Sequence, residues 1–166
     1  MDLYPWLKLL HILGVSLFVG AHGVSMFVGF RLRGQTDRAR LSALLDLSLV
    51  ATWIMYVGLL TLVISGIADG IIGAWFTSGR LWLWVAVVLL VVVAGAMYPM
   101  ATEPLQRIRW SLGLKTQKNM TAQLGASPAS DDVLQGQLAA WNPIRPAIIG
   151  LGGIVIITWL MVMKPF

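Results

Sequence analysis

The sequence predicts an all-α membrane protein with four transmembrane helices, and two observations carry this prediction. Of 166 residues, 58% are hydrophobic and only 11% are charged, which leaves too few polar residues to cover a water-facing surface. The charged residues also leave four uncharged windows of about 20 residues, and at about 1.5 Å of helix per residue each spans a hydrocarbon core of about 30 Å. These windows are residues 9–30, 47–68, 81–102 and 146–163.

Local signals predict where these helices begin and end. The first helix is expected to begin near Pro5, and because no basic segment or small-residue cleavage site accompanies it, we expect no removed signal peptide. Gly34 is expected to stop this helix, and Pro99 to kink the third one near its inner end. The expected helices are residues 6–30, 46–68, 81–103 and 145–163, with loops 31–45 and 104–144, all in one membrane domain over residues 1–166.

The long connection after the third helix carries two further helical patterns. In PLQRIRW, which begins at Pro104, apolar residues alternate with bases. This predicts either an extension of the third helix or a helix in the membrane interface. Ser130 or Asp131 is expected to cap a short helix that ends at Leu138, before WNPIRP starts the last transmembrane helix.

The lysines and arginines predict which helix ends face the cytoplasm. Nine of the 12 lie in the connections after the first and third helices, or beside them. The positive-inside rule therefore places both connections in the cytoplasm and both termini outside, in an antiparallel four-helix bundle. The net charge of +5 then reflects this asymmetry and contact with anionic lipid, and no nucleic-acid partner is expected. The nine are Arg31, Arg33, Arg38, Arg40, Arg107, Arg109, Lys115, Lys118 and Arg145, and the opposite side holds Lys8, Arg80 and Lys164.

Several kinds of chemistry are excluded by the composition. The chain has no cysteine, which removes thiolate catalysis, iron–sulfur clusters and cysteine-ligated zinc. No serine stands in a nucleophile motif, and no phosphate-binding glycine loop is present. The carboxylates Asp46, Asp69 and Glu103 fall at predicted helix ends, which argues against a carboxylate-driven pump. We therefore assign no catalytic residue and do not expect the chain to be an enzyme on its own.

The ionisable residues inside the predicted spans are concentrated in the first helix, which contains both histidines of the chain, His11 and His22. About three helical turns separate them, so they share one face and lie about 16 Å apart along the axis. Gly14 and Ser25 share this face, and small residues are typical of a face packed against protein. An ionisable side chain at membrane depth indicates a functional site, and the alternative is a structural hydrogen bond across helices.

Two stacked histidines on one transmembrane helix suit haem ligation, because neutral imidazole nitrogen binds iron. His11 and His22 are therefore candidate cofactor ligands, with His11 as the haem iron ligand. Since the chain has no third histidine, the other axial ligand would be a methionine, an open position or the same histidine of a second copy in a homodimer. Depth sets Met55 and Met97 level with His22, and Met161 level with His11, although methionine is also a common filler of apolar gaps.

The opening LKLLHILGVSLFVGAHG resembles the first helix of bacterial membrane proteins related to copper-resistance protein D and to the HemJ-type protoporphyrinogen oxidase. The segments LLTLVISG, GRLWLW, PLQRIR and WLMVMKP further resemble an uncharacterised group of four-helix integral membrane proteins near that superfamily. This resemblance covers most of the chain and places His11 at the family histidine. By analogy with the oxidase relatives, it implies b-type haem at His11, while His22 matches no family position. The chain lacks an outer Met/His cluster for copper and a second polar cluster for porphyrinogen oxidation, so we expect neither activity.

The leading hypothesis is an integral membrane accessory subunit, linked to redox chemistry through b-type haem at His11. Its expected partners are the lipid bilayer and either a second copy of the chain or other membrane subunits. The main alternative is a cofactor-free structural or assembly subunit of a larger membrane complex, whose small-residue faces and interfacial tryptophans serve helix contacts. A channel for small solutes is a third hypothesis.

Overall fold

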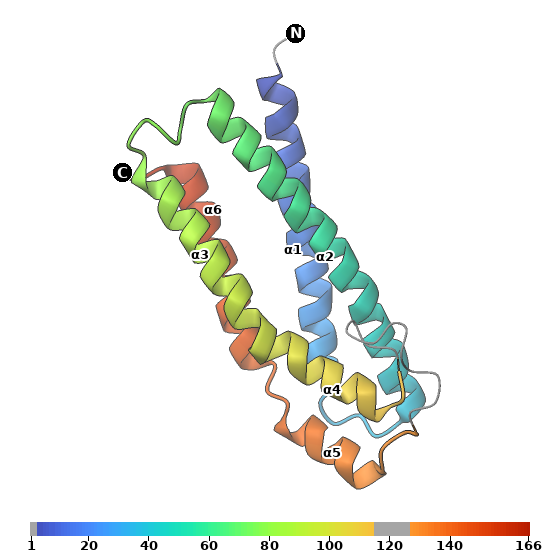
Figure 1. Ribbon diagram of the computed structural model, residues 1–166. Coiled ribbons are helices and arrows are strands. Elements are labelled where there is room, and N and C mark those ends of the chain that lie inside the picture. Colours follow the sequence, from blue (N-terminus) through green and yellow to red (C-terminus); the bar gives the residue numbers. More distant parts are fainter. Residues whose placement is uncertain (1–2, 115–126) are drawn as a thin grey trace.

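All regular elements that the computed structural model describes, over residues 3–114 and 127–166, are helices. Four stretches are long and apolar enough to cross a membrane: α1, α2, α6, and the run Leu81–Ser111 that joins α3 to α4. The predicted all-α class with four membrane-length helices is thus confirmed (Figure 1). In chain order the elements are α1 (Tyr4–Arg31), α2 (Arg38–Ile72), α3 (Leu81–Met97), the π-helix η1 (Tyr98–Thr102), α4 (Glu103–Ser111), α5 (Asp131–Ala140) and α6 (Ile144–Met163).

Both expected loops are shorter than the sequence predicts, because helix continues into them. α1 ends before Gly34, whose φ of +76° requires a residue without a side chain. α2 then begins at Arg38, where the Asp37 side chain accepts a hydrogen bond from the Ala39 backbone N–H at 2.9 Å. This first part of α2 is helical because its leucines, including Leu41, are buried and extend the apolar face. Residues 115–126 of the second expected loop lie outside the described residues.

The third membrane-length helix is bent by a π-helical turn. Pro99 lies in this turn, where its missing N–H and its ring prevent regular α-helical bonding. The helix continues as α4, so the PLQRIRW segment is an extension of the third helix. Glu103 and Arg107 form an exposed ion pair on α4 at 2.6 Å. The predicted effect of Pro99 and one of the two predicted roles of this segment are therefore confirmed.

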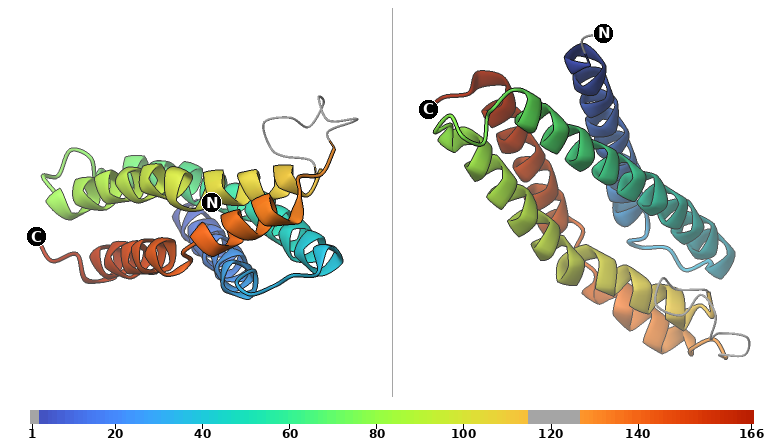
Figure 2. Two further views of the ribbon diagram at one scale, coloured as in Figure 1. Left: turned by 90° about the horizontal axis from the view of Figure 1, so that it is seen from below. Right: turned by 45° about the horizontal axis from the view of Figure 1, so that its top comes forward.

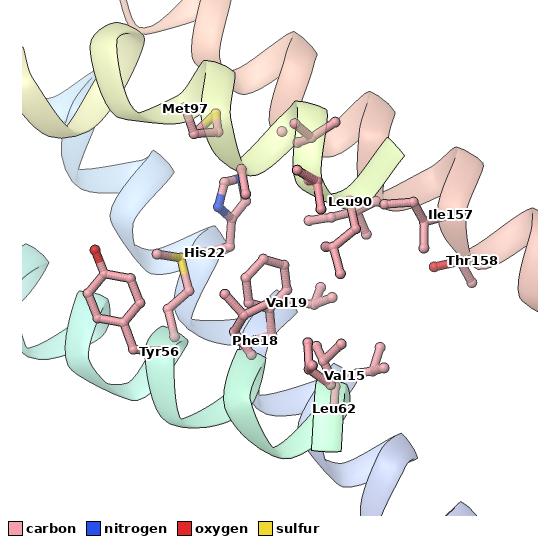
Figure 3. A pocket seen from close by; sticks show the side chains of 18 of the residues that line it. Val15, Phe18, Val19, His22, Tyr56, Leu62, Leu90, Met97, Ile157 and Thr158 are labelled. Atoms are coloured by element: carbon pink, nitrogen blue, oxygen red, sulfur yellow. The ribbon is translucent and has the colours of Figure 1, made fainter. Parts of the chain in front are cut away.

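The helices pack as two pairs, α1 with α2 and α3 with α6 (Figure 2). Both chain termini lie at one end of the molecule, here called the terminal end, and α5 lies at the other, the α5 end. Side chains from all four long helices converge on a cavity between the pairs (Figure 3). The shape of this cavity depends on how each helix pair is held together and on which residues close the two ends of the cavity.

Glycines allow the backbones of α1 and α2 to touch. A Cβ atom on Gly14 would lie 2.7 Å from the backbone nitrogen of Leu62, and one on Gly58 would lie 2.6 Å from the backbone nitrogen of Phe18. Neither position can accept a side chain without separating the helices. In a membrane such small-residue crossings replace the hydrophobic effect as the source of helix association, because lipid is as apolar as the protein.

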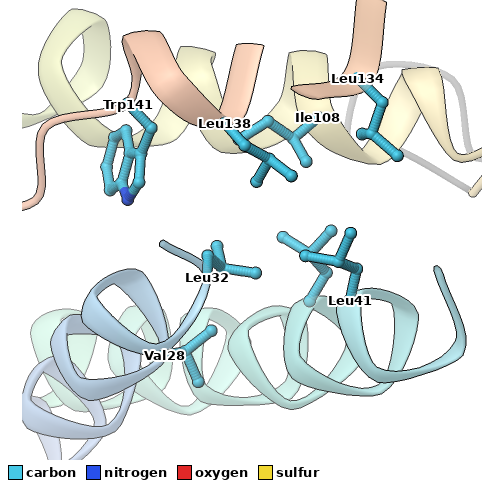
Figure 4. Packing of buried hydrophobic residues seen from close by; sticks show 8 residues of the cluster. Val28, Leu32, Leu41, Ile108, Leu134, Leu138 and Trp141 are labelled. Atoms are coloured by element: carbon cyan, nitrogen blue, oxygen red, sulfur yellow. The ribbon is translucent and has the colours of Figure 1, made fainter. Parts of the chain in front are cut away.

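An apolar cluster at the α5 end joins the two helix pairs. Its leucines and isoleucine face one another across the boundary between α4–α5 and α1–α2 (Figure 4). The Trp141 indole N–H donates to the Gly29 carbonyl at 2.8 Å, and Arg38 pairs with Asp131 at 2.6 Å. Ser130 is the N-cap residue of α5, which confirms the predicted short helix, although this helix ends at Ala140. The cluster consists of Val28, Leu32, Leu41, Leu45, Ile108, Leu134, Leu138 and Trp141.

The glycine crossing leads to a stability prediction with a matched control on the same helix. Gly14→Ala should lower the free energy of unfolding by about 1–3 kcal/mol, because the new methyl group meets backbone atoms that cannot rotate away. Gly20→Ala meets no atom within 4 Å and should be neutral or stabilising, by up to about 1 kcal/mol. Chemical unfolding in detergent, followed by circular dichroism, measures both. Equal stabilities would contradict the proposed role of the crossing.

Candidate intramembrane site

A cavity of about 920 Å³ lies between the two helix pairs and is lined mainly by apolar side chains. Its volume is at the upper end of the range of about 300–1,000 Å³ for cofactor and small-molecule sites. At the α5 end it is bounded by Trp141 and Leu45 of the cluster described above. At the terminal end it is bounded by aromatic side chains of the α2–α3 connection and of α3, namely Trp75, Phe76 and Trp82.

The structure brings all five sequence-predicted cofactor residues to this one cavity. The two histidines come from α1, and the three methionines come from α2, α3 and α6. Within residues 3–114 and 127–166, no group of three or more His, Asp or Glu side chains is arranged to hold a metal ion. The five are His11, His22, Met55, Met97 and Met161.

His11 is held by a hydrogen bond to the backbone of α2. Its Nδ1 lies 2.8 Å from the Leu62 carbonyl oxygen and 3.3 Å from Ser65 Oγ. A carbonyl can only accept, so Nδ1 carries the ring proton. The Ser65 hydroxyl donates to the Thr61 carbonyl at 2.6 Å, which leaves its lone pairs free to accept from His11. Such interhelical bonds contribute only about 0.6 kcal/mol on average, so the main effect is to fix the ring's orientation and tautomer.

The fixed tautomer leaves His11 Nε2 with an available lone pair. No hydrogen-bond partner of Nε2 is found in the part of the chain that the structure describes. The ring edge that carries Nδ1 and Cε1 rests on Gly66, where a Cβ atom would lie 3.0 Å from Cε1. His11 is among the residues that line the cavity, and an imidazole that donates one N–H to a carbonyl while its other nitrogen is unprotonated is the usual arrangement of a metal-ligating histidine.

His22 has a different environment. It is 7% exposed, and its ring stacks on Phe18 with centroids 6.1 Å apart. Its Nε2 is buried without a hydrogen-bond partner among the described residues, and a Cβ on Gly150 of α6 would lie only 2.5 Å from it. The backbone of α6 thus occupies the space in front of this nitrogen, which leaves no room for a porphyrin there. His22 packs α1 against α6.

The three methionines reach the cavity from three different helices. Met97 faces His22 across the cavity in Figure 3, and its sulfur lies 3.6 Å from the position that a Cβ on Gly150 would take. Met161 packs against the buried cluster that includes Trp82 and Leu160, which is the role of a core filler. Met55 lines the cavity from α2.

Sequence reasoning missed two polar residues of the cavity. Asp69 lies in the last turn of α2, at a helix end as expected, but it is only 4% exposed. Its spacing of four residues from Ser65 places both on one face of α2, and this spacing was the signal available in the sequence. Arg109 is also buried, and it reaches Asp46 at 3.0 Å, so a pair of charged side chains joins α4 to α2.

No protein-family model matches the chain, and searches of curated proteins and of solved structures returned no match. The functional inference therefore rests on the cavity and its polar groups. The resemblance to the copper-resistance-D-like and HemJ-like superfamily stays an expectation.

The packing role of His22 can be tested through its coupling to Gly150. Gly150→Ala should destabilise the protein because its methyl group overlaps the imidazole, whereas the same change in a His22→Ala background should cost less. The difference between the two, measured by unfolding in detergent, is expected to be about 0.5–3 kcal/mol. Gly152→Ala, which meets no atom within 4 Å, is the control on the same helix. Strict additivity of His22→Ala and Gly150→Ala would contradict this packing role.

Proposed function

We propose that this protein is a membrane accessory subunit that binds one b-type haem in the cavity through His11 and takes part in electron transfer. The observation that carries the proposal is the hydrogen bond from His11 Nδ1 to the Leu62 carbonyl, since it leaves a neutral Nε2 in a cavity of cofactor size. Bound haem would supply one-electron chemistry that the side chains alone lack.

The residues around His11 fit such a cofactor. The Leu62 carbonyl and Ser65 accept hydrogen bonds from Nδ1 and so orient the imidazole, with its unprotonated Nε2 left as a possible ligand. The apolar lining excludes water and provides contact area for a large flat ring. His22 is the less suitable ligand, because Gly150 covers its Nε2.

The second axial position has two candidate occupants. Met161 lines the same cavity from α6, and a second copy of the chain could present its own His11 across a homodimer interface. Exposed apolar side chains on α1, such as Leu9 and Leu13, are available for contact with lipid, with a second copy or with another membrane subunit.

The proposed location is a bacterial cytoplasmic membrane, with both termini outside. This orientation is supported by the distribution of lysines and arginines, most of which belong to the α5 end of the molecule. At that end, Arg38 and Arg109 are engaged in ion pairs that hold the helices together.

Haem binding predicts a specific absorption spectrum, which should be lost when His11 is replaced. Protein purified from haem-replete cells should show, after reduction by dithionite, the sharp α band of b-type haem. His11→Ala should abolish this band, and His22→Ala should retain it in protein that keeps its helix content. Ser65→Ala should weaken haem binding by about tenfold, since the Leu62 carbonyl still orients the ring. A featureless spectrum of the unaltered protein would refute the proposal. It would favour the second candidate function, a cofactor-free structural subunit, which is supported by the packing of His22 against Gly150.

The orientation predicts the behaviour of reporter fusions. A reporter enzyme that is active only outside the cytoplasmic membrane should be active when fused after Phe166 and inactive when fused at Gly34, between α1 and α2. The reverse pattern would overturn the orientation while leaving the haem proposal untouched.

A further inference from the structure

Asp69 is a buried polar group that neither the helix packing nor the haem proposal explains. It lies on α2 at the terminal end of the cavity, and it is 4% exposed. Its Oδ1 atom is fully buried and accepts no hydrogen bond from any residue that the structure describes. A buried acceptor without a donor is destabilising, so a bound molecule that donates a hydrogen bond would be held at this position.

The nearby cations do not serve as that donor. Lys8 and Lys164 both line the cavity, yet the ion pairs formed by the described residues do not include Asp69. The Lys164 ammonium group lies over two aromatic rings, 5.3 Å from the centroid of Trp75 and 5.6 Å from that of Trp82. The Asp69 carboxylate therefore lines the cavity without a cationic partner among the described residues.

Flat aromatic side chains pack against the end of α2 that carries Asp69. Phe76 packs against Gly70 so closely that a Cβ there would lie 2.5 Å from the ring, and Trp75 packs in the same way against Gly73. Tyr4 meets Trp75 edge to face, with centroids 6.4 Å apart. These walls favour a ligand with an aromatic ring, because ring pairs gain stabilisation beyond their buried area.

The charges near Asp69 restrict the ligand further. A cation would be attracted by Asp69 but repelled by Lys8 and Lys164, and an anion would face the buried carboxylate itself. A neutral molecule that donates a hydroxyl proton meets neither penalty. An apolar body would also let it enter from lipid.

We propose that the terminal end of the cavity binds a neutral, lipid-soluble phenol or hydroquinone, whose hydroxyl group donates to the Asp69 carboxylate while its ring lies among Trp75, Phe76 and Trp82. Four residues separate Asp69 from Ser65, which is about 6 Å along α2. The ring subsite is therefore beside the His11 position and does not depend on haem being there.

The test compares two ligands that differ only in their hydroxyl groups. A hydroquinone with a decyl tail and its dimethyl ether are titrated calorimetrically into purified protein in detergent, with empty micelles as the blank. The hydroquinone should bind at least about tenfold more tightly, since the ether leaves Asp69 unpaired. Equal affinities would overturn the proposal, and so would tighter binding of tetraphenylphosphonium, since the site would then be one for a cation.

Variants assign the effect to Asp69. Asp69→Leu should remove the preference for the hydroquinone, whereas Asp132→Leu, the same change at an exposed residue of α5, should keep it. His11→Ala should also keep it, which separates this proposal from haem binding. If Asp69→Leu does not fold, infrared difference spectra of the unaltered protein replace it. Hydroquinone, but not the ether, should then shift a carboxyl band that is absent in Asp69→Asn, and no shift would refute the assignment.

Discussion

The close approach of α1 and α2 at Gly14 and Gly58 is the constraint on which the rest of the structure depends. In the bilayer two apolar helix faces gain little from each other, because lipid offers the same contacts. Backbone contact through glycines supplies the packing that a hydrophobic effect would supply in water. It also brings the His11 ring within 2.8 Å of the Leu62 carbonyl, so the chemistry of the cavity follows directly from the packing of the helices.

The polar groups of the cavity fall into two kinds. His11, together with Ser65 behind it, hydrogen-bonds to the backbone of α2, and the His11 Nε2 lone pair stays unused. His22 Nε2 and Asp69 Oδ1 are buried without a donor or an acceptor among the described residues. His22 packs against Gly150 and Phe18, whereas no described residue donates a hydrogen bond to Asp69 Oδ1. We therefore assign a packing role to His22 and a ligand-binding role to Asp69.

Fold class and the number of membrane spans were predictable because they depend on composition and on the length of each apolar segment relative to the bilayer, and both can be read directly from the sequence. The gathering of both histidines and three methionines in one cavity was predictable in part, because helical periodicity and depth can be read along one chain. The division into two helix pairs was not predictable, because it depends on which backbone each glycine contacts, such as the contact of Gly58 with the backbone of Phe18. For the same reason the sequence favoured His11 over His22 without revealing the physical difference between them. Their difference arises from Leu62 and Gly150, which are remote in the chain.

The contacts of His11 also bear on biogenesis. All of its hydrogen-bond partners, and the glycines that position them, lie before the end of α2 at Ile72. During synthesis, the first helical hairpin can therefore complete its polar contacts before the second hairpin leaves the ribosome, since chains emerge from the N-terminus at about 5–20 residues per second. The cavity then forms only when α3 and α6 pack against the α1–α2 pair, which has already assembled. The histidine would thus be oriented before any cofactor has a place to bind.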